Sequence, residues 1–201
     1  MKRRTLQFTV LLVGALYGLL ALLGSTLVAP VYTASNSIVI ASSLDNTWNE
    51  LTHFKQYPAW NPYLVSVEGD LVPGEKISIT LVTENFDKPF TTSPTIASVE
   101  LRRQFHWENG FSVPGLYDTR HFFVLEEIGK TETRLLQFEE FRGVLVWLLP
   151  ERPKRQRAAE KGFALMHQAL KLRLEDSSFT ANTELAGSAT DSTHGLSHER
   201  D

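Results

Sequence analysis

A histidine and a carboxylate on two consecutive predicted strands are the residues that could do acid/base chemistry near neutral pH. His121 lies in the run Thr119–Ile128, and Glu139 lies in the next run, Thr131–Leu145, after a short turn. A histidine beside a carboxylate can act as a general acid or base. If the two runs form a hairpin, the side chains can be neighbours, which makes this pair the candidate catalytic group.

The sequence argues against several other chemistries. No candidate nucleophile with a distinctive local motif accompanies the pair, and His53, His106 and His167 show no spacing typical of metal ligands. The chain has no cysteine, which excludes disulfides, Cys-ligated zinc and thiol chemistry. A formal charge of −3 argues against a nucleic-acid-binding protein. We therefore expect no metal, no cofactor and no nucleic-acid partner.

Strand alternation places further polar groups on the same face as His121. Phe123 shares its face, and Gln137, Glu139 and Phe141 share one face of the neighbouring strand. Burying such polar groups in a dry core is costly unless they are paired. Either they hydrogen-bond one another in a sealed core, or they face a wet or ligand-filled pocket. The sequence leaves both readings open.

The elements that would position these residues form one α+β domain over Ser35–Glu175. A short strand at Ser37–Ile40 and a short amphipathic helix at Asn46–Leu51 precede several period-2 runs separated by turn residues. A helical pattern between Lys154 and Leu174 closes the domain, with an apolar stripe at Ala159, Phe163, Met166, Leu170 and Leu174. We predict a curved antiparallel sheet wrapped around this long C-terminal helix, because their apolar faces cover each other.

Both ends of the chain differ from this domain. Residues 1–34 contain three basic residues and then Phe8–Ala29, an uncharged apolar run long enough to cross a bilayer about 30 Å thick. We predict an N-terminal transmembrane helix, with a cleaved signal peptide or a buried helix as alternatives. The basic residues place the domain on the non-cytoplasmic side of a single-pass anchor. Residues 176–201, rich in Ser, Thr, Ala and Gly, are predicted to be a disordered tail.

Short motifs follow one another in the order of the predicted elements. They are Trp60–Tyr63 (WNPY), Val67–Gly69, Pro73–Lys76, Phe105–Trp107, Gly115–Asp118, His121–Phe123, Glu139–Gly143, Gly162–Met166 and Ala169–Lys171. These segments resemble the START-like helix-grip superfamily, often labelled SRPBCC or polyketide cyclase/dehydrase-like. The resemblance covers nearly all of Ser35–Glu175 and implies a helix-grip fold. The superfamily includes lipid carriers, hormone receptors and cyclases, so the fold alone leaves the function open.

A helix gripped by a bent sheet leaves a cavity with an apolar lining. The aromatic, proline-rich loop Gln56–Tyr63 is expected near its entrance, where Trp60 and Tyr63 would cap it; alternatively they plug the core. We predict a non-enzymatic module that binds a hydrophobic small molecule or lipid. The predicted ligand-binding residues are Trp60, Tyr63, Phe105, Trp107, His121, Phe123, Gln137, Glu139, Phe141, Phe163, Met166 and Leu170. The alternative is a cyclase- or hydrolase-like enzyme using His121 and Glu139.

A second notable segment is Gly143–Pro150, in which six consecutive apolar residues precede a basic stretch. On a tethered domain this pattern is typical of a membrane-facing lip, and the alternative is a buried strand end followed by a solvated helix start. The predicted membrane-contacting residues are Trp147, Leu148, Lys154, Arg155 and Arg157. A third hypothesis is an assembly role, in which the domain offers a surface to another envelope protein.

Overall fold

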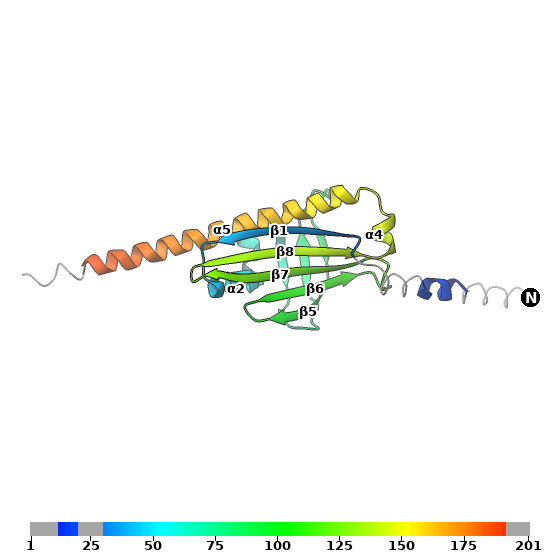
Figure 1. The fold of residues 1–201 in the computed structure, drawn as a ribbon, viewed down its shortest axis with the longest axis horizontal. Coiled ribbons are helices and arrows are strands. Elements are labelled where there is room, and N and C mark those ends of the chain that lie inside the picture. The colour runs from blue at the N-terminus through cyan, green and yellow to red at the C-terminus, as the bar shows by residue number, and fades with distance from the viewer. Residues whose placement is uncertain (1–11, 20–29, 192–201) are drawn as a thin grey trace, which may run out of the picture.

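The computed structural model of the protein describes the backbone of residues 12–19 and 30–191, and side chains as far as residue 176 (Figure 1). Residues 12–19 are helical. The strands are β1 (Tyr32–Ile40), β2 (Leu64–Glu68), β3 (Ser78–Leu81), β4 (Phe90–Thr92), β5 (Thr95–Glu100), β6 (Gln104–Gly110), β7 (Asp118–Gly129) and β8 (Glu132–Arg142). The helices are α2 (Leu44–Thr52), η1 (Phe54–Gln56), α3 (Tyr57–Trp60), α4 (Val144–Leu148) and α5 (Arg152–Asp191).

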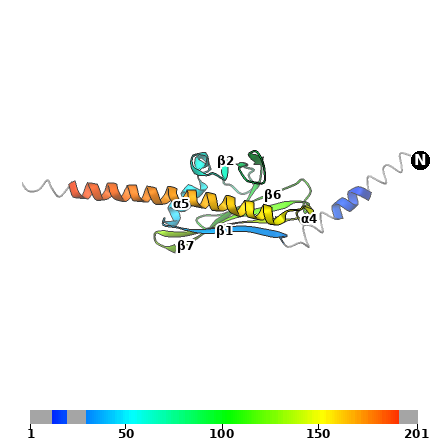
Figure 2. The same cartoon turned by 90° about the horizontal axis from the view of Figure 1, so that it is seen from above.

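Two antiparallel sheets build the domain. The larger has the strand order β1-β8-β7-β6-β5, so the first strand pairs with the last, and the smaller has the order β2-β3-β4. Helix α5 runs along the larger sheet beside β1 (Figures 1 and 2). The predicted α+β architecture, an antiparallel sheet with a long C-terminal helix against it, is confirmed.

Strand alternation decides which side chains form the core. On β7, residues Thr119, His121, Phe123 and Leu125 are buried, and the residues between them are more exposed. Helix α5 buries a matching stripe at intervals of three and four residues, namely Ala159, Phe163, Met166, Leu170 and Leu174. Burying each large apolar side chain contributes about 1.5–3 kcal/mol, so this contact between helix and sheet is a main source of stability.

The chain between the hairpin β7–β8 and α5 differs from the prediction. The sequence pattern predicts a strand as far as Leu145, but β8 ends at Arg142. Gly143 has a φ of 106°, and a Cβ there would lie 2.6 Å from the carbonyl oxygen of Leu116. Only glycine adopts this conformation readily, so the strand stops and α4 begins.

The aromatic stretch after α2 also differs from the prediction of a loop. Tyr57–Trp60 forms one turn of helix, because Pro58 lies in the first turn, where its missing N–H has no helical partner to lose. The side-chain oxygen of Asn61 then accepts hydrogen bonds from the backbone N–H of Tyr63 and Leu64, at 3.0 and 2.9 Å. This Asx-type turn leads directly into β2.

The predicted anchor and tail are only partly described. Among the described residues, no helix is both long and apolar enough to cross a bilayer. Of the run Phe8–Ala29, only residues 12–19 are described, and the rest lies outside the described residues. Helix α5 continues to Asp191, past the predicted domain boundary at Glu175 and into the stretch whose composition predicts disorder.

Gly162 on α5 allows Tyr63 to pack against the helix backbone. A Cβ at residue 162 would overlap the Tyr63 ring, which is buried. Alanine usually stabilises a helix interior relative to glycine by about 1 kcal/mol, but here we expect Gly162→Ala to lower the free energy of unfolding by about 1–3 kcal/mol. Denaturant unfolding measures the change.

Gly129→Ala is the matched control, because a Cβ there meets its nearest neighbour at an ordinary 3.6 Å. Adding Tyr63→Leu should make the effect of Gly162→Ala smaller than it is alone, since the two residues are in contact. A stabilising Gly162→Ala would show that the ring does not occupy this position.

Candidate ligand-binding site

A cluster of polar side chains lies on the inward face of the larger sheet. His121 on β7 is directly opposite Glu139 on β8, and Phe123 is opposite Gln137. The amide nitrogen of Gln137 lies 2.8 Å from Nε2 of His121. Nδ1 of His121 lies 3.9 Å from the carboxylate of Glu139. The adjacency expected from a hairpin is therefore present, while a catalytic role for the pair stays a prediction.

These contacts define the tautomer of His121. The Gln137 amide nitrogen can only donate, so Nε2 of His121 accepts and Nδ1 carries the proton. That proton faces Glu139. The Glu139 carboxyl also makes a hydrogen bond with the side chain of Thr119. The cluster is thus a group of polar side chains that contact one another across two strands.

Helix α5 adds His167 to the cluster. Nδ1 of His167 lies 2.8 Å from Oδ1 of Asn36, a residue of β1 that pairs with Gln137 across the sheet. Because the amide oxygen accepts, Nδ1 of His167 donates, and its Nε2 is left as an acceptor. Both this Nε2 and Oε1 of Gln137 are buried without a hydrogen-bond partner among the described residues. Two unsatisfied acceptors therefore lie between the helix and the sheet.

Burial keeps these groups mostly uncharged. Desolvation, and then the proximity of His167, lowers the pKa of His121 to about 3, and burial lowers the pKa of His167 to about 4. Burial raises the pKa of Glu139 to about 7, against the opposing effect of its hydrogen bond with Thr119. Burial therefore favours the neutral form of both histidines at pH 7.

Aromatic rings enclose the polar cluster. The ring of His121 lies 4.8 Å from Phe123, 5.0 Å from Phe163 and 5.2 Å from Trp107, measured between centroids. Phe163, Met166 and Leu170 of α5 are fully buried against this face. In the described residues, these side chains fill the space between helix and sheet, where the sequence pattern predicts an open cavity.

Two hollows are prominent in the described part of the chain, and no residue of α5 lines either one. The larger, about 460 Å³, lies where β6, β7 and β8 meet the loop 111–117; the smaller, about 310 Å³, lies between η1 and β2. Thr119 lines the larger hollow, and its side chain bonds to Glu139 of the cluster. Of the residues of the cluster, Thr119 alone lines this hollow, whose lining also includes Glu108, Arg120 and Arg142.

The structure brings most of the predicted ligand-binding residues together. Ring contacts join Phe105, Trp107, His121, Phe123, Phe163 and Tyr63 in one buried group. Tyr63 is buried in the core beside Gly162. This position favours the alternative in which Tyr63 fills the core over the one in which it caps the entrance of a cavity. Trp60 instead lies against Tyr57 at 5.0 Å, and Phe141 stacks on Tyr32 at 4.4 Å near the end of the sheet.

Three residues of the cluster are absent from the sequence prediction, namely Asn36, Thr119 and His167. Thr119 shares the strand parity of His121, which is a signal that could have found it. Position 167 directly follows Met166 of the helical stripe, which is a weaker signal of the same kind. Among the described residues, no group of three or more His, Asp or Glu side chains is arranged to hold a metal ion.

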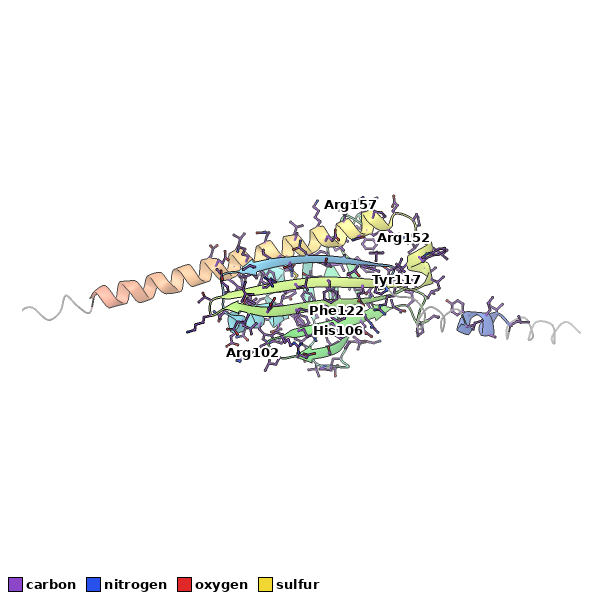
Figure 3. The ribbon with its side chains drawn as sticks, in the orientation of Figure 1. Arg102, His106, Tyr117, Phe122, Arg152 and Arg157 are labelled. Atoms are coloured by element: carbon purple, nitrogen blue, oxygen red, sulfur yellow. The ribbon has the colours of Figure 1, made fainter. Side chains whose placement is uncertain are left out.

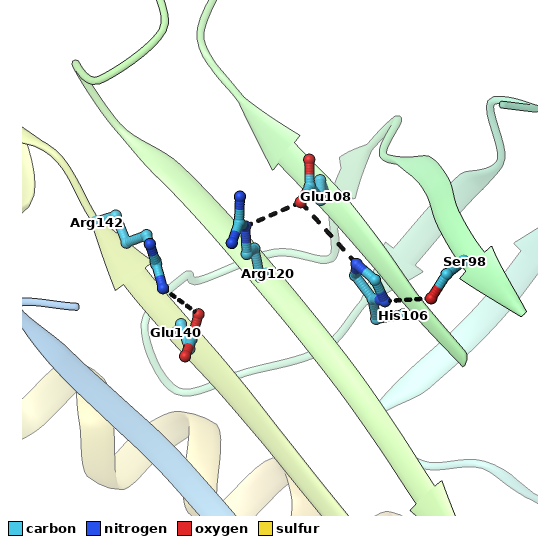
Figure 4. A network of polar contacts seen from close by, with 6 residues as sticks. All are labelled: Ser98, His106, Glu108, Arg120, Glu140 and Arg142. Atoms are coloured by element: carbon cyan, nitrogen blue, oxygen red, sulfur yellow. Dashed lines mark hydrogen bonds and ion pairs between the residues drawn. The ribbon is translucent and has the colours of Figure 1, made fainter. Parts of the chain in front are cut away.

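A separate polar network lies on the outward face of the same sheet (Figure 4). His106 Nδ1 lies 2.7 Å from Ser98, and Arg120 pairs with Glu108 at 2.9 Å. Arg142 pairs with Glu140 at 2.7 Å. These side chains alternate with the inward ones, so the network lies on the far side of the sheet from the buried cluster.

Comparison with known proteins identifies the fold. No family model and no curated protein matches the chain. Solved structures do match it, among them a START superfamily protein from Mycobacterium smegmatis, with 15% identity and a TM-score of 0.56 over 72% of this chain and 97% of that one. The chain has a START-like fold.

Other structures with this fold show how broad the likeness is. A hypothetical protein from Helicobacter pylori gives a TM-score of 0.58 at 12% identity, covering 75% of this chain and 92% of that one. A norcoclaurine synthase from Thalictrum gives 0.52 at 15% identity, with coverages of 75% and 99%. At such identities the likeness shows the START-like fold alone, so function must be argued from the site.

Proposed function

We propose that this START-like domain binds a hydrophobic small molecule or lipid whose polar end is a hydrogen-bond donor. The pair of buried acceptors, Oε1 of Gln137 and Nε2 of His167, is the observation that carries the proposal. A buried acceptor without a partner costs about 1–3 kcal/mol. A hydroxyl group placed between helix and sheet would satisfy such an acceptor, whereas a carboxylate would add a third acceptor.

The surroundings of the acceptors support an apolar body for this ligand. Aromatic and aliphatic side chains surround the cluster, and apolar burial there would contribute roughly 25 cal/mol per Å². Because Phe163 and Met166 fill the space, binding requires α5 to move away from the sheet or these side chains to change rotamer. The hollow beside Thr119 is the proposed way in.

The membrane part of the proposal rests on the N-terminal segment. Residues 1–34 would anchor the protein as a single-pass segment, with the domain on the non-cytoplasmic side. In the described part of that segment, Leu12, Val13, Leu16, Tyr17 and Leu19 are exposed rather than packed against the domain. Exposed apolar side chains on a helix favour a lipid or protein environment over water.

Two matched probes test the ligand class. A pyrene-labelled long-chain alcohol and the corresponding pyrene-labelled alkane differ only in the hydroxyl group. The full chain is expected to bind the alcohol about tenfold more tightly, which is the effect of one good hydrogen bond. Fluorescence titration measures both affinities, and a chain that takes up neither probe would contradict the proposal.

His167→Asn is the variant that isolates the acceptor. Asparagine can keep a donor toward Asn36 while removing Nε2, so the preference for the alcohol should fall to what Oε1 of Gln137 alone supports, and alkane binding should remain. His53→Asn, the same change at an exposed position, is the control and should keep the preference. Thermal unfolding of each variant establishes that the fold is retained.

An acid/base enzyme is the second candidate function, and Glu139 is the residue that favours it. Its pKa of about 7 suits proton transfer near neutral pH, and Thr119 connects it to the larger hollow. His121 would then orient Glu139 rather than exchange protons with a substrate. Loss of any discovered turnover in Glu139→Gln would support this candidate, and unchanged turnover would remove it.

A further inference from the structure

Large apolar side chains are exposed together at one end of the domain. Trp147 and Leu148 of α4 are each 60% exposed, and Phe111 in the loop after β6 is 58% exposed. We call this region the α4 end and define it as the loop 111–117, helix α4 and the start of α5 at 151–157. Residues of this size are normally buried in a water-soluble domain.

Hydrogen bonds hold two of these segments, the loop 111–117 and α4, side by side. The backbone N–H groups of Val144 and Leu145 donate to the carbonyl oxygens of Gly115 and Leu116, at 3.1 and 2.9 Å. Figure 3 places Tyr117 and Arg152 at the same end of the molecule, with Arg102 far from them. The loop and α4 therefore form one surface, and the start of α5 follows α4 directly in the chain.

Basic side chains border the apolar group. Arg152, Lys154 and Arg157 are exposed and Arg155 is half-buried, whereas Glu151 is the one acidic residue of that stretch and pairs with Lys154 at 3.7 Å. Positive charge at a helix N-terminus opposes the helix dipole, so these residues do not stabilise α5 there. Apolar side chains bordered by cations are the pattern of an interfacial membrane contact.

The chain that precedes β1 reaches the domain at this same end. Tyr32, the first residue of β1, stacks on Phe141 just before α4, and its neighbour Val31 donates a backbone hydrogen bond to Phe141. The chain thus enters β1 at the end of the sheet where α4 lies (Figure 1). A bilayer that holds the apolar N-terminal segment would lie against the α4 end.

We propose that the α4 end docks on the surface of an anionic membrane. Trp147, Leu148 and Phe111 enter the interface, and the four basic residues contact anionic headgroups. The proposal rests on the proposed attachment of residues 1–34, and adds to it that the domain itself contacts lipid in one fixed orientation. It is independent of what the domain binds in its interior.

A single cysteine label tests the contact, because the natural chain has no cysteine. Leu148→Cys carries an environment-sensitive fluorophore at the α4 end. Leu101→Cys is the matched control, since Leu101 is 74% exposed in the turn between β5 and β6, at the opposite end of the sheet. Both labelled full chains are reconstituted in phosphatidylcholine vesicles with and without phosphatidylglycerol, some containing a lipid-borne quencher.

The expected result is a blue-shifted emission at residue 148 and quenching severalfold greater than at residue 101, both stronger with phosphatidylglycerol. Replacing Arg152, Lys154, Arg155 and Arg157 by glutamine should remove the dependence on phosphatidylglycerol. In a different outcome, the chains float with the vesicles while the fluorophores at residues 148 and 101 both emit as they do in water. This result would contradict the docking and leave the attachment of the N-terminal segment standing. Release of the chains from the vesicles by high salt would instead contradict the anchor.

Two further outcomes would overturn the proposal. Chains that do not float with either kind of vesicle would exclude both the docking and the attachment. A disulfide between two copies of Leu148→Cys that forms in detergent as readily as in vesicles would assign the surface to a second copy of this chain.

Discussion

Replacing Phe163 with alanine is expected to lower the free energy of unfolding by about 3–5 kcal/mol. Phe163 is fully buried at the centre of the contact between α5 and the sheet, with ring centroids 5.8 Å from Tyr63 and 5.0 Å from His121. Alanine would remove its contacts with both layers and leave a cavity beside the polar cluster. Denaturant unfolding monitored by circular dichroism measures the loss.

Leu165→Ala provides the control on the same helix, because Leu165 is exposed two positions away. Its effect should stay within about 0.5 kcal/mol, as for most surface substitutions. Equal effects of the two substitutions would mean that α5 does not pack on the sheet through Phe163. The cavity left by Phe163→Ala should also strengthen binding of the pyrene-labelled alkane.

Replacing Glu139 with glutamine is expected to stabilise the protein by up to about 3 kcal/mol at pH 8 and by much less at pH 5. Burial raises the pKa of Glu139 from 4.5 to about 7, and this difference corresponds to roughly 3 kcal/mol. The side chain keeps 15% of its exposure, so the full value is an upper limit. Urea unfolding of both proteins across this pH range measures the difference.

The direction of this effect follows from proton binding. The folded state holds the Glu139 proton more tightly than the unfolded state does, so the native protein loses stability as pH rises from about 4.5 to about 7. The lowered pKa values of His121 and His167 act in the opposite direction, because stability is lost as pH falls below 6.5. The stability of the Glu139→Gln variant should therefore still fall at acidic pH, because of the two histidines, but should no longer fall as pH rises from about 4.5 to about 7.

Glu140→Gln is the control for the pH effect. Glu140 is the next residue on β8, faces outward and pairs with Arg142, so its replacement should not stabilise the protein at pH 8. A Glu139→Gln variant that changes stability equally at pH 5 and pH 8 would show that Glu139 is not buried in its acid form.

Strand alternation made the inward face predictable from the sequence. The side chains of His121, Phe123 and Gln137 lie on one face because residues two apart on a strand point the same way, and a short turn joins β7 to β8 in register. The apolar stripe of α5 was predictable for the same kind of reason, from its spacing of three and four residues.

The contacts between distant segments could not be predicted in this way. Asn36 reaches His167 only because β1 pairs with β8, and no local pattern in the chain encodes that pairing. The unsatisfied acceptors depend on side-chain positions rather than on spacing. The end of β8 at Arg142 depends on the approach of Leu116 to Gly143, which is likewise a contact across the fold.

The pairing of the first strand with the last has a consequence for how the chain folds. It joins Tyr32 to Phe141 and Ile40 to Thr133, residues about a hundred positions apart, so a large loop must close before this pair can form. During synthesis β1 leaves the ribosome long before β8 exists, and its exposed edge has no native partner in the interval. The sheet can be completed only when nearly the whole domain has been made, which sets β1 docking as a late step in folding.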